Sequence, residues 1–281
     1  MRIAVTGASG FIGQAVLKEL CRRGITASGC ARTNVKLIEM LGHRGIAIDI
    51  HSPPDSVFDK LGKPDTLIHL AWGGLPNYGS LKHFEQELPA HYKFLKHLVE
   101  AGVSYLLVAG TCLEYGMQFG SLSETCFPRP ETPYAFAKDA LRRMLTLLKK
   151  EKNFNLTWAR IFYVYGEGQS ETSIFSQLRR AVSSGARIFN MSGGEQLRDY
   201  LPVEAVASIL VNLALLRKDI GVVNVCSGKP VSMRRLVESW IRENGWSIEL
   251  NLGYYPYPDY EPMAFWGDRS KLEAVLEGRC P

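Results

Sequence analysis

Tyr134 and Lys138 are the two residues whose types and spacing point most directly to chemistry. They stand four apart at the head of a segment with helical periodicity, so both side chains lie on one face of the helix. An ammonium group beside a phenol favours the phenolate and lowers the tyrosine pKa towards working pH. Such a phenol suits proton exchange with a carbonyl oxygen during hydride transfer. The same pair also occurs on ordinary helix surfaces, so its interpretation depends on the surrounding elements.

A glycine-rich turn at the start of the chain supplies the partner that hydride transfer needs. An apolar run over 2–5 predicts a strand, and an amphipathic helix follows the turn. Glycines at 7, 10 and 13 permit a tight turn, close approach of a pyrophosphate and close helix–strand packing. The free N–H groups at the start of the helix then face the phosphates. We therefore predict a dinucleotide site that includes Gly7, Gly10, Phe11, Ile12 and Gly13.

The next strand, expected over 25–31, bears on the cofactor's identity. A carboxylate at its end would hold the ribose 2′-OH of NAD, whereas an arginine attracts the 2′-phosphate of NADP. This chain has no acidic residue at the end of that strand, and Arg32 follows it directly. We predict NADP(H) as the preferred cofactor, with NAD(H) as the alternative. Two further strands, expected over 45–50 and 65–71, bring four more cofactor residues: Asp49, Ile50, Leu70 and Ala71.

The near-continuous apolar character of these strands predicts a parallel sheet covered on both faces, a doubly wound α/β (Rossmann) fold. His69 lies within a strand and is expected to be satisfied inside the fold. The long helix over 81–101 contains Pro89, which predicts a kink or two segments. Its histidines lack the spacing of metal ligands on one face, and we expect them at the surface: His83, His91 and His97.

Composition limits the classes of partner. The chain has 281 residues, 46% of them hydrophobic, and a net charge of +5. Lys and Arg do not cluster, which argues against nucleic-acid binding. Six scattered cysteines without a C-x-x-C pair favour reduced thiols in the cytoplasm over a metal site or disulfides. The N-terminus enters a strand at once, so no signal peptide is expected, and no apolar run suffices to span a membrane.

Four motifs together resemble an extended short-chain dehydrogenase/reductase of the NAD-dependent epimerase/dehydratase family. They are T-G-A-S-G-F-I-G at 6–13, H-L-A at 69–71, G-T-x-x-x-Y-G at 110–116 and Y-x-x-x-K at 134–138. Two later segments resemble further family motifs in the right order: R-I-F-Y-V-Y-G at 160–166 and R-D-Y-L-P-V-E-A-V-A at 198–207.

The resemblance implies a Thr111–Tyr134–Lys138 triad. Thr111 would bind the substrate carbonyl, Tyr134 would pass the proton, and Lys138 would hold the nicotinamide ribose. Arg198 matches the arginine that contacts the diphosphate of a nucleoside-diphosphate sugar, a task that suits a guanidinium. The resemblance also implies a homodimer formed through a helical bundle. It adds Phe162 to the cofactor residues, and it gives the expected substrate residues as Trp72, Cys112, Leu113, Tyr163, Arg187 and Arg198.

Departures from the family pattern narrow the reaction. Dehydratases of the family carry T-D-E-x-Y, whereas 111–115 reads T-C-L-E-Y. Cys112 and Leu113 cannot do the acid–base work of water loss, and Glu114 is expected to point to the other side. Epimerase-reductases carry a cysteine where Leu113 stands. What remains is hydride transfer at a carbonyl, by a C4 epimerase or a reductase, and Arg32 favours an NADPH-dependent reductase of a 4-keto-6-deoxysugar nucleotide.

Other departures keep further alternatives open. Tyr163 stands where the family often has a substrate-contacting Asn, which favours another small carbonyl compound as substrate. The stretch 260–265 lacks the second phosphate-binding arginine, for which Arg179, Arg180 or Arg187 could substitute. A non-catalytic cofactor-sensing protein on the same fold is the remaining alternative. Such a sensor needs the glycine turn but not the proton donor, so the complete triad argues against it.

The expected elements suggest two domains. Residues 1–165 form the dinucleotide-binding domain, and 199–225 return to it as a helix and a strand. A substrate-binding cap takes 166–198 and 226–281. The aromatic, Pro-rich stretches at 254–258 and 265–266 either form a wall of the substrate cleft or only pack against the cap.

Overall fold

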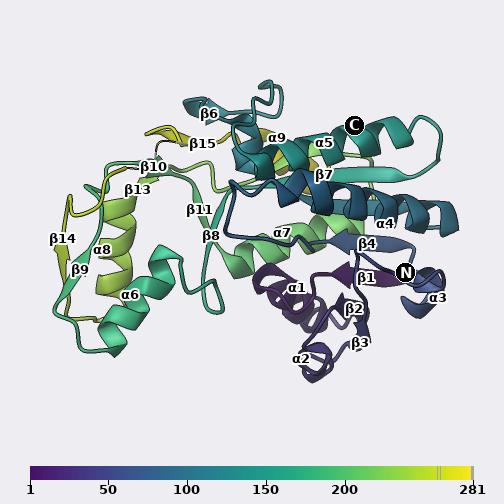
Figure 1. The fold of residues 1–281 in the computed structure, drawn as a ribbon, viewed down its shortest axis with the longest axis horizontal. Helices are drawn as coiled ribbons and strands as arrows, with labels where there is room; N and C mark the ends of the chain where they lie inside the picture. Colours follow the sequence, from purple (N-terminus) through teal and green to yellow (C-terminus); the bar gives the residue numbers. More distant parts are fainter. Residues whose placement is uncertain (258, 260, 280–281) are drawn as a thin grey trace.

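The computed structural model describes residues 1–257, 259 and 261–279; Pro258, Tyr260 and Cys280 therefore lie outside the described residues. Its centre is a seven-stranded parallel sheet with the order β12-β7-β5-β4-β1-β2-β3 (Figure 1). This is the doubly wound α/β fold expected from the sequence. The strands are β1 (Ile3–Thr6), β2 (Ala27–Ala31), β3 (Arg44–Ala47), β4 (Thr66–His69), β5 (Tyr105–Thr111), β7 (Asn155–Ile161) and β12 (Gly221–Val225).

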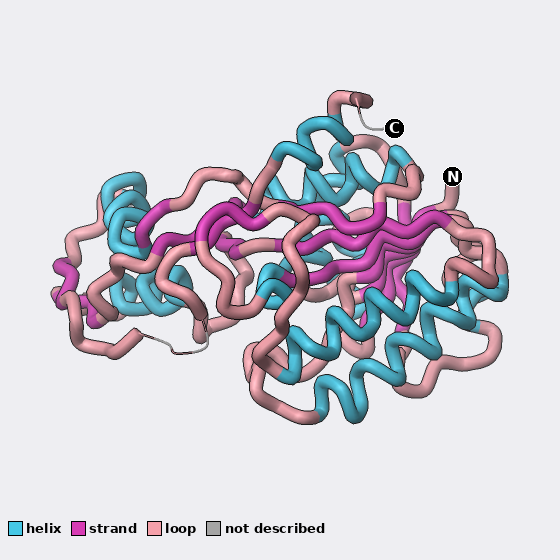
Figure 2. The backbone as a smooth tube through the Cα atoms, turned by 90° about the horizontal axis from the view of Figure 1, so that it is seen from above, coloured by secondary structure: helices cyan, strands magenta, loops and turns pink. Residues whose placement is uncertain are grey.

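Helices cover both faces of the sheet, and each face has its own apolar core. Alternate residues of β1 divide between the two, because Val5 packs with one cluster and Ala4 with the other. The first cluster includes α1 (Phe11–Arg22), α7 (Val203–Leu216) and α9 (Ser270–Leu276). The second includes α3 (Val57–Lys60), α4 (Leu88–Ala101) and α5 (Pro133–Leu148). Figure 2 shows the strands as a twisted layer with helices on either side. The short α2 (Val35–Met40) connects β2 to β3.

The long segment predicted over 81–101 consists of two helical pieces. A π-helical turn, His83–Glu87, leads into α4, which has Pro89 in its first turn. Proline is tolerated there because the first turn of a helix has N–H groups without intrahelical partners. The prediction of a kink or two segments was therefore right.

The second half of the chain builds a smaller layer beside the sheet, at the left of Figure 1. It contains α6 (Ile174–Ser183) and α8 (Met233–Asn244), with β9 (Ile188–Asn190) paired to β14 (Glu249–Asn251). Between it and the sheet lie three short strand pairs. They are β8 (Tyr163–Tyr165) with β11 (Tyr200–Pro202), β10 (Leu197–Arg198) with β13 (Val231–Ser232), and β6 (Gly120–Leu122) with β15 (Phe265–Gly267).

Residues 203–225 return to the sheet, because α7 packs on α1 and β12 pairs with β7. The exact domain boundaries stay a prediction. None of the helices in the described part of the chain combines the length and hydrophobicity that crossing a bilayer requires.

Candidate active site

The glycine turn joins the end of β1 to α1 and packs against the loop after β4. Gly7 has a φ of +66°, and a Cβ on it would lie 2.7 Å from the backbone nitrogen of Ala71. A Cβ on Gly13 would collide with the carbonyl oxygen of Gly7. Gly10 is the N-cap of α1. The glycines therefore occupy the turn, the helix start and the helix–strand contact, as their spacing predicts.

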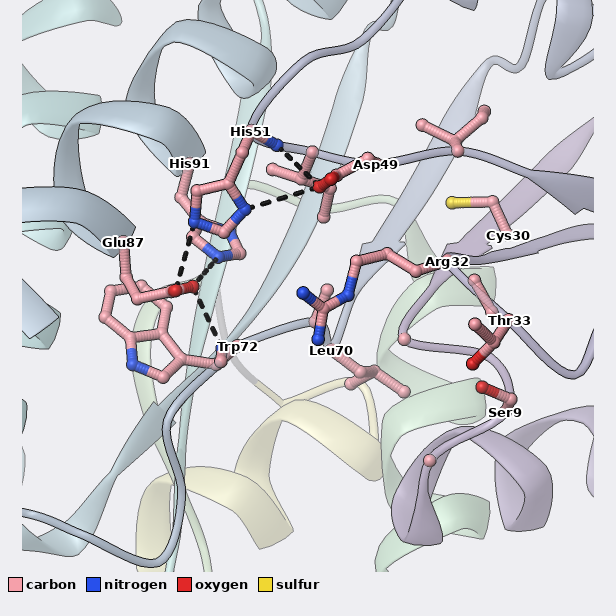
Figure 3. A pocket seen from close by; sticks show the side chains of 17 residues that line it. Ser9, Cys30, Arg32, Thr33, Asp49, His51, Leu70, Trp72, Glu87 and His91 are labelled. Atoms are coloured by element: carbon pink, nitrogen blue, oxygen red, sulfur yellow. Dashed lines mark hydrogen bonds and ion pairs between the residues drawn. The ribbon is translucent and has the colours of Figure 1, made fainter. Parts of the chain in front are cut away.

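A cavity of 310 Å³ opens at the carboxyl ends of β1 to β4, where ligands bind in open α/β sheets. Figure 3 shows Arg32 pointing into it from the end of β2, opposite Asp49. Of the predicted cofactor residues, those that line it are Gly7, Gly10, Arg32, Asp49, Ile50, Leu70 and Ala71.

Other predicted cofactor residues lie elsewhere. Phe11 lines a different, outer hollow beside α7, and Ile12 packs against the core under α1. Phe162 is buried in a small cluster with Tyr115 and Phe265. The cavity lining does not include Phe162, so cofactor contact by this residue stays a prediction.

The three residues of the predicted triad come together where β5 ends and α5 begins. Thr111 is the last residue of β5, and Tyr134 lies in the first turn of α5. Thr132 caps that helix by accepting the N–H of Ala135 at 3.2 Å, which fixes the start of α5 and so the position of Tyr134. Tyr134 is 7% exposed, and the side chain of Thr111 opposes the rise that burial causes in its pKa. Lys138 follows one turn later and is 3% exposed.

The electrostatics of the pair differ from the sequence expectation. Burial raises the pKa of Tyr134 above its ordinary value, with smaller contributions from Tyr78 and Glu114. The expected lowering by Lys138 was wrong for this structure. Its ammonium donates instead to the carbonyl oxygen of Ala109 at 2.7 Å. Burial also lowers the pKa of Lys138 to about 7. At neutral pH Tyr134 is therefore a neutral phenol, the form that donates a proton.

Substituting Lys138 by methionine is expected to stabilise the fold by about 1–3 kcal/mol at neutral pH, at the expense of activity. The pKa of Lys138 falls from 10.5 to about 7 in the folded chain. The unfolded chain then binds the proton more readily, so wild-type stability rises with pH between those values. The gain in K138M is largest at or below pH 7 and shrinks towards pH 10. Urea unfolding across this range measures it.

The control for this prediction is Lys150→Met, because Lys150 is an exposed lysine just beyond α5. Its substitution should show no such dependence on pH. A gain in K138M that is equal at every pH would mean that packing, and not protonation, is responsible.

Glu114 supports Thr111 from below. It is fully buried and caps the short 3-10 helix Cys112–Tyr115 reciprocally with Thr111. Its Oε1 accepts the N–H of Thr111 at 2.9 Å, and its Oε2 accepts the Nε of Arg160 at 2.7 Å. The indole N–H of Trp158 donates to the same carboxylate at 2.9 Å. Glu114 therefore points away from the reacting face, as its position in the motif predicted.

A buried chain of histidines lies beside the cavity, and the sequence did not reveal it. Thr6 Oγ1 lies 2.9 Å from Nδ1 of His69, as expected for a histidine satisfied inside the fold. His69 Nε2 lies 2.8 Å from Nδ1 of His91, whose Nε2 lies 3.2 Å from Oε2 of Glu87. The predicted surface position was right for His97 and wrong for His83 and His91, which are 0% and 1% exposed.

A second cavity, of 570 Å³, lies between the sheet and the outer layer. Tyr163 and Arg198 line it, as do Tyr255 and Tyr257 of the aromatic stretch. Arg198 is 3% exposed, and its Nη2 lies 3.1 Å from Oε2 of Glu261. Arg198 is the one cationic side chain lining this cavity within the described part of the chain.

Four predicted substrate residues lie away from this cavity, and one of them, Trp72, lines the first cavity instead. Cys112 is buried in the cluster with Tyr115 and Phe162, and Leu113 donates its N–H to Thr111. Arg187 is exposed before β9 and does not line the cavity. The proposed substitutes Arg179 and Arg180 pair with Glu167 and Glu171. The structure thus brings together Tyr163 and Arg198, but not Arg187.

Residues 3–226 match the sequence profile of the "NAD dependent epimerase/dehydratase family". The chain belongs to this family. It is 30% identical over 270 residues to "dTDP-6-deoxy-L-talose 4-dehydrogenase (NAD(+))" of Aggregatibacter actinomycetemcomitans, covering 95% of this chain and 99% of that protein.

Two further proteins are similar over nearly the whole chain. "GDP-6-deoxy-D-talose 4-dehydrogenase" of the same organism is 26% identical, over 98% of this chain and 91% of that protein. The solved structure of "MoeE5 in complex with UDP-glucuronic acid and NAD" superposes with a TM-score of 0.83 at 28% identity. That match covers 99% of this chain and 93% of the solved one.

Proposed function

We propose that the protein transfers hydride between a nicotinamide cofactor and C4 of a nucleoside-diphosphate 6-deoxysugar, acting as a 4-ketoreductase. One observation carries this proposal. Thr111, Tyr134 and Lys138 meet at the end of β5, while Cys112 is buried in the core and Glu114 is held by Arg160. The site has a proton donor for a carbonyl oxygen, and it lacks the second acid–base pair that water loss would need.

The residues divide the work of the reduction. A bound nicotinamide would supply the hydride. Tyr134, neutral at working pH, protonates the oxygen that becomes the C4 hydroxyl. Thr111 holds that oxygen in place through its hydroxyl, and its own backbone N–H is fixed by Glu114. Lys138 holds the ribose and, when charged, stabilises the phenolate that Tyr134 leaves behind.

The relatives support C4 as the reacting position. The names of two of them describe 4-dehydrogenases of nucleotide-linked 6-deoxysugars. Dehydrogenation at C4 and reduction of the 4-ketone are the same hydride transfer in opposite directions. Arg198 supports a diphosphate-linked substrate, since a guanidinium binds phosphate through paired hydrogen bonds.

A C4 epimerase that retains NAD is the second candidate, and one feature of the site favours it. Tyr134 and Lys138 are buried, so a proton that Tyr134 takes up in the oxidation step is shielded from solvent until Tyr134 returns it in the reduction step. An epimerase changes C4 stereochemistry without net consumption of cofactor, which separates it from a reductase. Measuring cofactor consumption with substrates that differ in sugar or nucleotide base, and with other small carbonyl compounds, identifies the substrate.

For the cofactor, the side chain of Arg32 supports NADPH, whereas the name of the 30% identical relative carries NAD⁺. Replacing Arg32 by alanine decides between them. If Arg32 binds the 2′-phosphate, the dissociation constant for NADPH rises about tenfold to a hundredfold, and that for NADH stays within about twofold. Titration calorimetry with both cofactors measures this. Arg44→Ala, at the exposed start of β3, is the matched control.

Equal changes for NADPH and NADH in R32A would contradict the phosphate role. Tight NADH binding by the wild-type protein, with weak NADPH binding, would move the assignment to NAD. A single cofactor that co-purifies and resists dialysis would favour the epimerase.

We also propose that the protein works as a homodimer formed through α4 and α5. These helices lie side by side, and α5 exposes Phe136 and Leu147, whose relative exposures are 53% and 59%. Sedimentation equilibrium measures the assembly state, and charged substitutions at both positions should yield monomers.

A further inference from the structure

Trp72 lies in the loop after β4, and its indole contacts Lys138, His91 and His83. Lys138 Nζ lies 4.2 Å from the centroid of the indole ring. The ring also stacks on His91, with centroids 4.6 Å apart and an interplanar angle of 21°. Its indole N–H donates to Nδ1 of His83 at 3.1 Å, and His83 Nε2 donates in turn to the carbonyl oxygen of Asn77. The indole is therefore fixed at both its face and its edge.

Glu87 anchors the residues behind the indole. Its Oε2 accepts from Nε2 of His91 and from the backbone N–H of Gly73 at 2.9 Å, and Oε1 lies 3.0 Å from Nε2 of His51 (Figure 3). A Cβ on Gly73 would lie 2.6 Å from this carboxylate, so a larger residue would displace the carboxylate from this position. Burial opposes ionisation, but the hydrogen bonds from His91 and Gly73 bring the pKa of Glu87 to about 2. The carboxylate is thus ionised at neutral pH.

The histidines between Glu87 and β1 are neutral, which gives their hydrogen bonds one direction. Burial lowers the pKa of both His69 and His91. With Glu87 ionised, His91 donates to Glu87, His69 donates to His91, and Thr6 donates to His69. Each ring nitrogen of His69 and His91 has a hydrogen-bond partner. The imidazole of His91, which stacks on Trp72, therefore has a fixed orientation.

Trp72, with His91 and Glu87 behind it, faces the ammonium group of Lys138. The charged or titratable groups around it come from five elements: Glu114 after β5, Glu87 before α4, His91 on α4, His69 on β4 and Tyr134 on α5. The two carboxylates favour its charged form, whereas burial disfavours it. The faces of Trp72 and, at 6.0 Å, of Trp158 add the electrostatic attraction of an aromatic ring for a cation.

We propose that Trp72 and Glu87 are positioning residues for Lys138. The indole face of Trp72 holds the ammonium at the end of β5, and Glu87 holds the indole through His91 while supplying a counter-charge. Trp72 then serves the catalytic lysine rather than the sugar. The proposal rests on the proposed function only in giving Lys138 its catalytic task.

The pH at which Lys138 loses its proton tests the positioning role of Trp72 and Glu87 without any substrate. Protein labelled with ¹³C at the lysine ε carbons is titrated by NMR, and K138M identifies the resonance of Lys138. In Trp72→Leu the titration midpoint should fall by about one pH unit, because the ring no longer stabilises the cation. Trp72→Phe should restore most of the difference. Glu87→Gln keeps the hydrogen-bond acceptor, removes the charge, and should lower the midpoint by about half a unit.

Trp246→Leu is the matched control, because Trp246 packs in the outer layer beyond α8 and its loss should leave the midpoint unchanged. An unchanged midpoint in Trp72→Leu overturns the proposal, as does a midpoint that falls equally in Trp246→Leu. If no 4-ketoreductase activity is found but the midpoint falls as expected, the proposed function fails and the positioning role stands.

Discussion

Replacing Tyr134 with phenylalanine is expected to lower kcat for reduction of a 4-keto sugar nucleotide by about a thousandfold. The substitution removes only the hydroxyl that donates the proton. Tyr134 is packed by Trp72, Tyr78 and His83, so the phenylalanine ring has the same neighbours. KM for the cofactor should stay within about twofold. Steady-state kinetics with saturating cofactor measures both constants.

Tyr105→Phe is the control for this prediction. Tyr105 is a buried tyrosine at the opposite end of β5, where its hydroxyl donates to Thr157 at 2.8 Å. Its substitution removes an equivalent buried hydroxyl and is expected to cost about 1 kcal/mol of stability with kcat unchanged. If Y134F kept a tenth or more of the wild-type kcat, Tyr134 could not be the proton donor.

The largest effect on stability is expected from Glu114→Ala. Arg160 is 1% exposed and pairs with this carboxylate, so the substitution leaves a buried guanidinium without its counter-charge. Breaking such a pair costs about 3–5 kcal/mol. The N–H groups of Thr111 and Trp158 lose their acceptor as well. Urea unfolding followed by circular dichroism gives the change in free energy of unfolding.

Glu100→Ala gives the comparison, because Glu100 pairs with Lys96 and Lys152 at the surface. Exposed ion pairs contribute about 0–1 kcal/mol. A loss in E114A no larger than that in E100A would mean that Glu114 does not neutralise Arg160. E114A should also lower kcat beyond its effect on stability, since the backbone of Thr111 is no longer fixed.

Local sequence patterns were sufficient for most of the sheet and the triad. Strand β7 (Asn155–Ile161) and helix α7 (Val203–Leu216) are each a single run with one periodicity, which local patterns can predict. The glycine turn and the Tyr–Lys pair were recognised because their chemistry depends on short spacings. Thr111 was named through the family resemblance, from the G-T-x-x-x-Y-G motif at 110–116, and it is the last residue of β5.

What the sequence could not give depends on contacts between distant segments. His91 looks exposed on a helix face, yet His69 of β4, 22 residues earlier, covers it. Arg198 meets Glu261, 63 residues away, and no local pattern links them. The pKa of Tyr134 follows from burial by the loops after β4 and β5, which outweighs any local effect of Lys138. Glu87 gave no signal at all, because a single acid in a helix is ordinarily a solvated one.

Isotope transfer tests the central claim most directly. The protein is incubated with a dTDP- or GDP-linked 4-keto-6-deoxysugar and a nicotinamide cofactor that carries deuterium at the transferable position. We expect one deuterium at C4 of the sugar for each cofactor oxidised, detected by NMR and mass spectrometry. With the corresponding 4-hydroxy sugar nucleotide as substrate instead, a product of inverted C4 configuration and no net change in cofactor would identify an epimerase. Deuterium that remains entirely on the cofactor, with every 4-keto sugar nucleotide offered, would contradict hydride transfer to C4.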